Sequence, residues 1–229
     1  MAETEYLLYH YPLCPFSRKV RVCLWEKGIS YDMVLEDFWK KRFEFIKMNP
    51  AGDLPVLVER KNGQEHVFSN HMAICEYLNE TVAGLDLFGA DVFFRAEVRR
   101  ICGWFDTLFY KEVTLPLTEE LVFKRLAPEK EPDSIRIRSA RHNLNRHMKY
   151  IEWLSERRNY LAGRNLSLAD FDVASHVSVL DYLGEIDWDK YPEAKQWYWK
   201  LKSRQSVQSL LKDRITGIIP PDSYLNLDF

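Results

Sequence analysis

The spacing of apolar residues changes along the chain, and each spacing predicts a different element. Residues 5–11, EYLLYHY, are rich in aromatic and aliphatic side chains and end at a proline, which is typical of a β-strand. Apolar side chains then recur every three or four residues between Pro15 and Gly28, which predicts a helix with proline in its first turn and glycine at its end. Residues 30–36, SYDMVLE, alternate as a second strand.

The next segments predict an irregular helix followed by a hairpin. Residues 37–52 are amphipathic but crowded with bulky side chains, which favours irregular helix. Residues 53–59, DLPVLVE, predict a strand, and Asn62-Gly63 is a strong signal for a tight turn. Residues 64–68, QEHVF, then return as the antiparallel partner.

A change of pattern divides the chain into two predicted domains. Asn70 is placed to cap a helix, so the order β-α-β-α-β-β-α predicts a compact α/β domain over residues 5–83. After a linker that contains glycine, only helical spacing remains, which predicts an all-α domain over residues 93–213. Within it, Ser167 and Asp170 form a capping-box pattern at the start of a helix. Residues 214–229 contain glycine and a Pro-Pro pair, and we expect an extended tail.

Composition and charge exclude several classes of protein. With 229 residues, of which 46% are hydrophobic, the chain is long enough for packed cores. A net charge of −2 argues against a nucleic-acid partner. No apolar run is long enough for membrane insertion, and the acidic N-terminus does not resemble a signal peptide, so we expect a cytoplasmic protein. The four cysteines and six histidines are scattered, and we expect no metal site.

Three local patterns, in this order and at this spacing, carry a family resemblance. They are CPFSRKVR at the first helix, NPAGDLPVLV before the proline-opened strand, and LAGRNLSLADF at the capping box. Together they resemble the glutathione S-transferase family over about residues 5–213. The resemblance implies a thioredoxin-like N-terminal domain (βαβαββα), a C-terminal helical bundle, and glutathione as the ligand of the family.

Cys14 is the first candidate for chemistry, with Ser17 beside it. A thiol at a helix N-terminus meets free backbone N–H groups and the positive end of the helix dipole, which favour a thiolate. Arg18 and Lys19 would add positive potential, so we expect a partly accessible thiol that is more acidic than free cysteine. Alternatively, Cys14 fills a capping position only. For the basic residues, Arg21 included, we favour a solvated helix face.

The resemblance also implies a glutathione site, which this sequence alters. Pro55 corresponds to the cis-proline of the fold, and the backbone of Leu54 would pair with the cysteinyl part of glutathione. The alternative is a trans proline that opens an edge strand. Where the family has Glu-Ser or Asp-Ser to hold the γ-glutamyl carboxylate, this chain has Asn70-His71. We therefore expect that no cofactor is required and that glutathione is at most a weak ligand.

Two segments are candidates for contact with a partner protein. Phe38, Trp39, Phe43 and Phe45 are interspersed with charged residues, and not all four rings can face inward on so short a segment. We expect Trp39 to be exposed as an anchor for a partner, although all four rings could instead be core. The tail either packs on its own domain or docks on a partner. Its candidate residues are Tyr224, Leu225, Leu227, Asp228 and Phe229.

These features support two functions. Several segments, among them residues 104–114, 122–134 and 176–188, resemble a branch of the family that binds FtsZ filaments in bacterial cell division. That resemblance implies an interaction protein at the division site, expected to be a homodimer with little or no transferase activity. The alternative is an active cytosolic glutathione transferase or thiol-disulfide oxidoreductase that uses Cys14. Asp106 is expected to pair with Arg99 or Arg100 rather than to act on a substrate.

Overall fold

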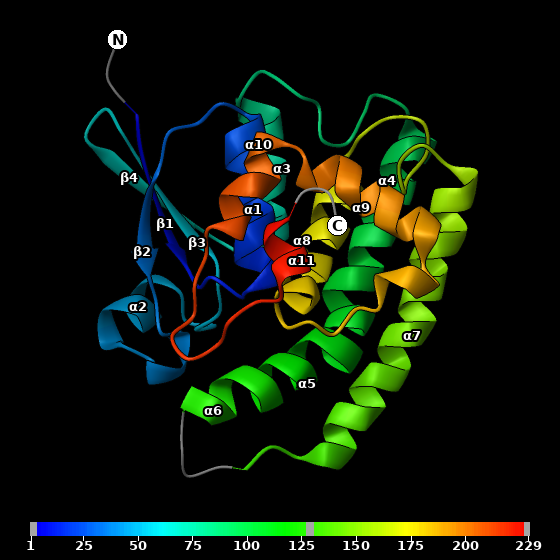
Figure 1. Ribbon diagram of the computed structural model, residues 1–229. Coiled ribbons are helices and arrows are strands. Elements are labelled where there is room, and N and C mark those ends of the chain that lie inside the picture. Colours follow the sequence, from blue (N-terminus) through cyan, green and yellow to red (C-terminus); the bar gives the residue numbers. More distant parts are fainter. Residues whose placement is uncertain (1–3, 127–130, 227–229) are drawn as a thin grey trace. The chain divides into compact units, whose positions relative to one another are not determined.

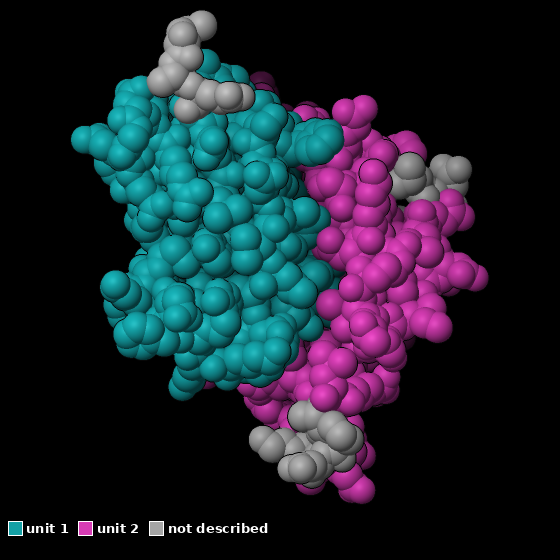
Figure 2. All heavy atoms as spheres, turned by 90° about the vertical axis from the view of Figure 1, so that its left-hand side faces the viewer, with its two compact units in different colours: residues 1–86 teal, residues 87–229 magenta. Residues whose placement is uncertain are grey.

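The computed structural model describes residues 4–126 and 131–226. The chain forms two compact units, residues 1–86 and residues 87–229, which Figure 2 shows in teal and magenta. Leu227, Asp228 and Phe229 of the predicted tail lie outside the described residues.

The first unit is built on a four-stranded mixed sheet, as the sequence predicts (Figure 1). Its strands are β1 (Glu5–His10), β2 (Asp32–Leu35), β3 (Val56–Lys61) and β4 (Gln64–Ser69), in the order β2-β1-β3-β4. Strand β1 is parallel to β2 and antiparallel to β3, and β3 is antiparallel to β4. The predicted order of elements is confirmed, including the hairpin.

Helices cover the two faces of this sheet because its strands alternate apolar side chains between them. Helix α1 (Pro15–Glu26) packs against α3 (His71–Thr81), and α3 contacts β4. On the opposite face, Tyr9 contacts Phe45 of α2 (Phe43–Met48), with ring centroids 6.0 Å apart. The short helix η1 (Phe38–Lys40) precedes α2, so the predicted irregular helix over residues 37–52 is confirmed.

The basic residues of α1 do not form the solvated face that the sequence favoured. Every residue from Ser17 to Leu24 is buried, so this stretch of the helix exposes no side to water. Arg18 and Lys19 are completely buried, and Arg21 is nearly so. The Nε of Arg18 donates a hydrogen bond to the carbonyl oxygen of Pro12 at 2.6 Å, which holds the turn before the helix. That interpretation of the basic residues was wrong.

The second unit is helical, as predicted. Its described residues contain no strand, only two isolated bridges between Tyr160 and Gly163 and between Ile215 and Ile218. Helix α8 (Leu168–Tyr182) is buried along its whole length and forms the centre of the unit. The elements are α4 (Val92–Gly103), η2 (Trp104–Thr114), α5 (Leu115–Thr118), η3 (Glu119–Phe123), α6 (Lys124–Leu126), α7 (Ser134–Arg157), α8 (Leu168–Tyr182), η4 (Trp188–Lys190), α9 (Pro192–Lys202), α10 (Gln205–Leu211) and α11 (Asp222–Leu225).

The predicted capping box fixes the start of α8. The carboxylate of Asp170, which is fully buried, accepts hydrogen bonds from the backbone N–H of Ser167 at 3.1 Å and of Leu161 at 2.8 Å. It also accepts one from the Nε1 of Trp197 on α9 at 3.0 Å. Burial raises the pKa of Asp170 to about 6, against the effect of these donors. One side chain thus ties a loop and two helices together.

The C-terminal segment packs back on its own unit. Tyr224 is completely buried, and its hydroxyl donates to the carbonyl oxygen of Leu210 at 3.1 Å. The buried ammonium group of Lys202 donates to the carbonyl oxygen of Ser223 at 2.7 Å. The expectation of an extended tail was wrong over residues 222–225, which form the helical turn α11, because these contacts stabilise it.

No helix among the described residues combines the length and the hydropathy that a membrane span requires.

We expect Tyr224→Ala to lower the free energy of unfolding by about 3–5 kcal/mol, the usual cost of removing a buried aromatic side chain. Leu225→Ala is the matched control, since Leu225 is the next residue on α11 and is 45% exposed. Urea unfolding followed by circular dichroism measures both. Equal effects of the two substitutions would contradict the packing of the tail described above.

Candidate functional site

Cys14 occupies the turn between β1 and α1 that the sequence singled out. Its backbone N–H donates to the carbonyl oxygen of Tyr11 at 3.0 Å, and its own carbonyl accepts from the N–H of Arg18 at 3.0 Å. Cys14 is therefore the N-cap of α1, and Pro15 is the first helical residue. Proline fits there because its ring fixes a helical φ and its missing N–H would have had no intrahelical acceptor.

The surroundings of the Cys14 thiol oppose its ionisation. Burial raises the pKa of Cys14, although the residue as a whole is half-buried. The hydroxyl of Ser17 and the backbone N–H groups of Ser17 and Phe16 act in the opposite direction, as expected at a helix N-terminus. Desolvation of the thiolate is the larger effect, so the predicted acidic thiol is wrong.

The structure brings the thiol to the start of β3. The Sγ of Cys14 lies 3.9 Å from the carbonyl oxygen of Leu54. The peptide bond between Leu54 and Pro55 is cis, as predicted. Cys14, Ser17, Leu54 and Pro55 therefore form one corner of the first unit, as the family resemblance implies. The pairing of the Leu54 backbone with glutathione stays a prediction.

The start of α3 is closed by its own cap. Asn70 adopts a positive φ of 72°, and its side-chain oxygen accepts from the N–H groups of Met72 at 2.9 Å and Ala73 at 3.2 Å. The predicted cap is confirmed. These N–H groups belong to the helix N-terminus that would hold the γ-glutamyl carboxylate of glutathione, and Asn70 already occupies them.

His71 links the start of α3 to the start of α1. Its ring stacks on that of Phe16, with centroids 4.4 Å apart and planes at 10°. Phe16 lies two residues after Cys14, so an imidazole occupies space beside the thiol corner. The sequence identified the His71 substitution, but its aromatic partner becomes apparent only in the fold.

An exposed apolar surface lies on the elements that follow β1. Trp39 is 43% exposed, as expected, and its ring packs edge-on against Tyr11 at 5.2 Å. Phe43 is 76% exposed, which the sequence did not single out, whereas Phe45 is buried. We define the β2–α2 surface as the exposed apolar residues of this segment: Met33, Leu35, Trp39 and Phe43.

One cluster in the second unit has the donor atoms of a cation site. Ligand atoms of Asp106, Asp172 and His176 all lie within 4.8 Å of one another. Of the two arginines expected to pair with Asp106, Arg100 pairs with Glu97 at 2.7 Å, and pairing with Arg99 stays a prediction. An oxygen of Asp106 lies 3.7 Å from the Nε2 of His176. The sequence missed this cluster because its residues come from distant parts of the chain.

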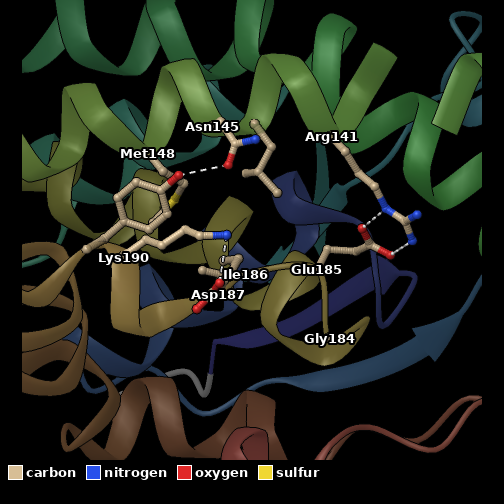
Figure 3. A pocket seen from close by; sticks show the side chains of 10 residues that line it. Arg141, Asn145, Met148, Gly184, Glu185, Ile186, Asp187 and Lys190 are labelled. Atoms are coloured by element: carbon tan, nitrogen blue, oxygen red, sulfur yellow. Dashed lines mark hydrogen bonds and ion pairs between the residues drawn. The ribbon is translucent and has the colours of Figure 1, made fainter. Parts of the chain in front are cut away.

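The second unit also contains a cavity of about 340 Å³ between α7 and the segment that follows α8 (Figure 3). No candidate residue from the sequence lines it. Its charged side chains neutralise one another across the walls, so the cavity offers no unbalanced charge to a ligand. The pairs are Arg141 with Glu185 at 2.7 Å and Lys190 with Asp187 at 2.8 Å.

We expect the Cys14 thiol to react slowly with iodoacetamide at neutral pH. Its rate should rise with a midpoint above about 8.5, the value of a free cysteine, because burial disfavours the thiolate. Mass spectrometry of the intact protein measures the rate, and Cys14→Ser identifies the reacting residue, since the other three cysteines are buried. Ser17→Ala should move the midpoint higher by removing a hydrogen bond to sulfur. A midpoint below the free value would contradict this prediction.

Comparisons with known proteins agree with this geometry. The family model for the glutathione S-transferase N-terminal domain matches residues 13–81. The family model for the glutathione S-transferase C-terminal domain matches residues 121–214.

Relatives extend the similarity to the full chain. FtsZ-localized protein A of Caulobacter vibrioides is 43% identical over 227 residues, covering 99% of this chain and 100% of the relative. The solved structure of FzlA from C. crescentus matches with a TM-score of 0.95 at 43% identity, covering 98% and 100% of the two chains. A glutathione S-transferase structure from Rhodospirillum rubrum F11 matches with a TM-score of 0.93 at 44% identity and the same coverage. The protein therefore belongs to the glutathione S-transferase family.

Proposed function

We propose that this protein binds FtsZ filaments and acts in cell division at the division site in the cytoplasm. The observation that carries the proposal is the full-length similarity to an FtsZ-localized protein at 43% identity. The site described above fits a binding protein better than an enzyme, because its thiol is desolvated and the amide donors of Met72 and Ala73 are occupied.

We assign the contact with the filament to the β2–α2 surface. Exposed aromatic rings are the side chains that most often dominate protein interfaces, since they bury a large area with few rotatable bonds. Trp39 is held by Tyr11 and Phe38 and is therefore positioned before a partner arrives. In the tail, Tyr224 is buried and would act by holding α11, whereas Leu225 is exposed for contact.

The double substitution Trp39→Ala, Phe43→Ala should weaken co-sedimentation with FtsZ polymers by about tenfold or more, as loss of an aromatic hot spot does. Trp199→Ala is the matched control, because Trp199 lies on α9 and is also 43% exposed. Circular dichroism should show that both variants remain folded. Unchanged co-sedimentation of the double variant would remove the β2–α2 surface from the proposal, and failure of the unmodified protein to co-sediment would reject the FtsZ function itself.

We propose further that glutathione is at most a weak ligand and is not a required cofactor. An anionic ligand at the start of α3 would have to displace the side chain of Asn70 from the N–H groups of Met72 and Ala73. Transferase or thiol-disulfide exchange activity through Cys14 is the second candidate. It is supported by the contact between the Cys14 thiol and Leu54, but the raised pKa of the thiol disfavours it.

The double substitution Asn70→Glu, His71→Ser should increase retention on immobilised glutathione, because it frees the α3 amides and restores a small hydroxyl. Asn70→Asp is the control, since an aspartate keeps the cap and should not gain retention. Retention is measured as the salt or free glutathione concentration needed for elution. Tight retention of the unmodified protein, with turnover of a standard electrophile, would favour the enzyme.

We also propose a homodimer, as the family resemblance implies. Light scattering after size-exclusion chromatography measures the mass directly, against 27.2 kDa for one chain.

A further inference from the structure

A cavity of about 290 Å³ lies at the turn end of the β3–β4 hairpin. This is the opposite end of β3 from Pro55 and the Cys14 corner. The side chains around the cavity come from the hairpin and from α3. They are Glu59, Lys61, Asn62, Gln64, His66, Phe68 and Tyr77.

The wall of this cavity contains a buried carboxylate. Glu59 is only 4% exposed. Its Oε1 accepts a hydrogen bond from the hydroxyl of Tyr6 at 3.0 Å, and its Oε2 accepts one from the hydroxyl of Tyr77 at 2.5 Å. Each oxygen of a carboxylate can accept a further hydrogen bond, so both keep a lone pair for another donor.

This carboxylate has no cationic partner in the part of the chain that the structure describes. No nitrogen of Lys, Arg or His lies within 4.0 Å of its oxygens among residues 4–126 and 131–226. Burial and the hydrogen bond to Glu59 raise the pKa of Tyr77 to about 12, so this phenol remains a neutral donor. A buried carboxylate with only neutral partners is costly, and a cation in the cavity would offset that cost.

Two aromatic rings line the same cavity. The rings of Phe68 and Tyr77 stack with centroids 4.1 Å apart and planes at 23°. Aromatic faces attract organic cations, and a planar guanidinium combines stacking with a pair of N–H groups that fit a carboxylate.

We propose that this cavity binds an alkylguanidinium group. Its N–H groups donate to Glu59, and its plane lies against the outer face of the stacked Phe68–Tyr77 pair. The group comes either from a free guanidine metabolite or from an arginine side chain of a partner protein, and both sources present the same chemistry to the cavity.

Titration of the full-length protein with two probes tests the proposal. The probes are agmatine and an arginine tripeptide blocked at both ends. Binding is measured from the NMR chemical shifts of the backbone amides in the β3–β4 hairpin. We expect saturable binding that Glu59→Gln weakens by about tenfold or more, because a hydrogen bond to a charged group is lost. Glu65→Gln is the matched control, since Glu65 is an exposed carboxylate of β4 that pairs with Arg60 at 2.9 Å.

The outcomes separate the sources and decide the proposal. Tighter binding of agmatine supports a free guanidine, and tighter binding of the peptide supports an arginine of a partner. Equal binding of butylamine and agmatine would overturn the preference for guanidinium. Binding that Glu59→Gln leaves unchanged, or no binding of either probe, would overturn the site. If Glu59→Gln does not fold, Phe68→Leu is titrated in its place, since it removes one of the two stacked rings. Weaker agmatine binding by this variant supports the site, and unchanged binding overturns it.

Discussion

The structure of the candidate site depends on one constraint, which is that the first amide groups of each helix must find an acceptor. At α3, Asn70 satisfies the N–H groups of Met72 and Ala73 from within the chain. Asp91 serves α4 and Asp133 serves α7 in the same way. Because the Asn70 cap already occupies the N–H groups of Met72 and Ala73, we propose that an anion is held only weakly at the start of α3.

Helix α1 shows the other side of this constraint. It has no side-chain acceptor at its start, and the group that meets its first amides is the thiol of Cys14. A helix N-terminus stabilises a thiolate, but taking the thiolate out of water costs more in this corner, so the pKa is raised. The same motif can therefore belong to a reactive cysteine or to an unreactive one, depending on what packs around it.

Together, these two helix starts support the proposal that this chain uses a transferase fold for binding. The corner keeps the cis peptide bond before Pro55 and the approach of the thiol to Leu54. Its ligand-holding amides are occupied, and the stacked rings of Phe16 and His71 lie beside the thiol. The β2–α2 surface, by contrast, has exposed apolar groups, and Trp39 and Phe43 there are available to another molecule. Retention of a fold does not require retention of its chemistry.

The sequence by itself determined what depends on local spacing and turn chemistry. The order of strands and helices in the first unit, the capping pair Ser167 and Asp170 and the Asn70 cap were predictable, because neighbours in the chain set them. The cis bond before Pro55 was implied by the family resemblance alone. Only the tertiary structure decided which groups are buried, and burial depends on contacts between residues far apart in sequence. It reversed the interpretation of Arg18 and Lys19, raised the pKa of Cys14 and buried Tyr224. It also placed Glu59 between Tyr6 and Tyr77, residues from three different elements that no local pattern connects.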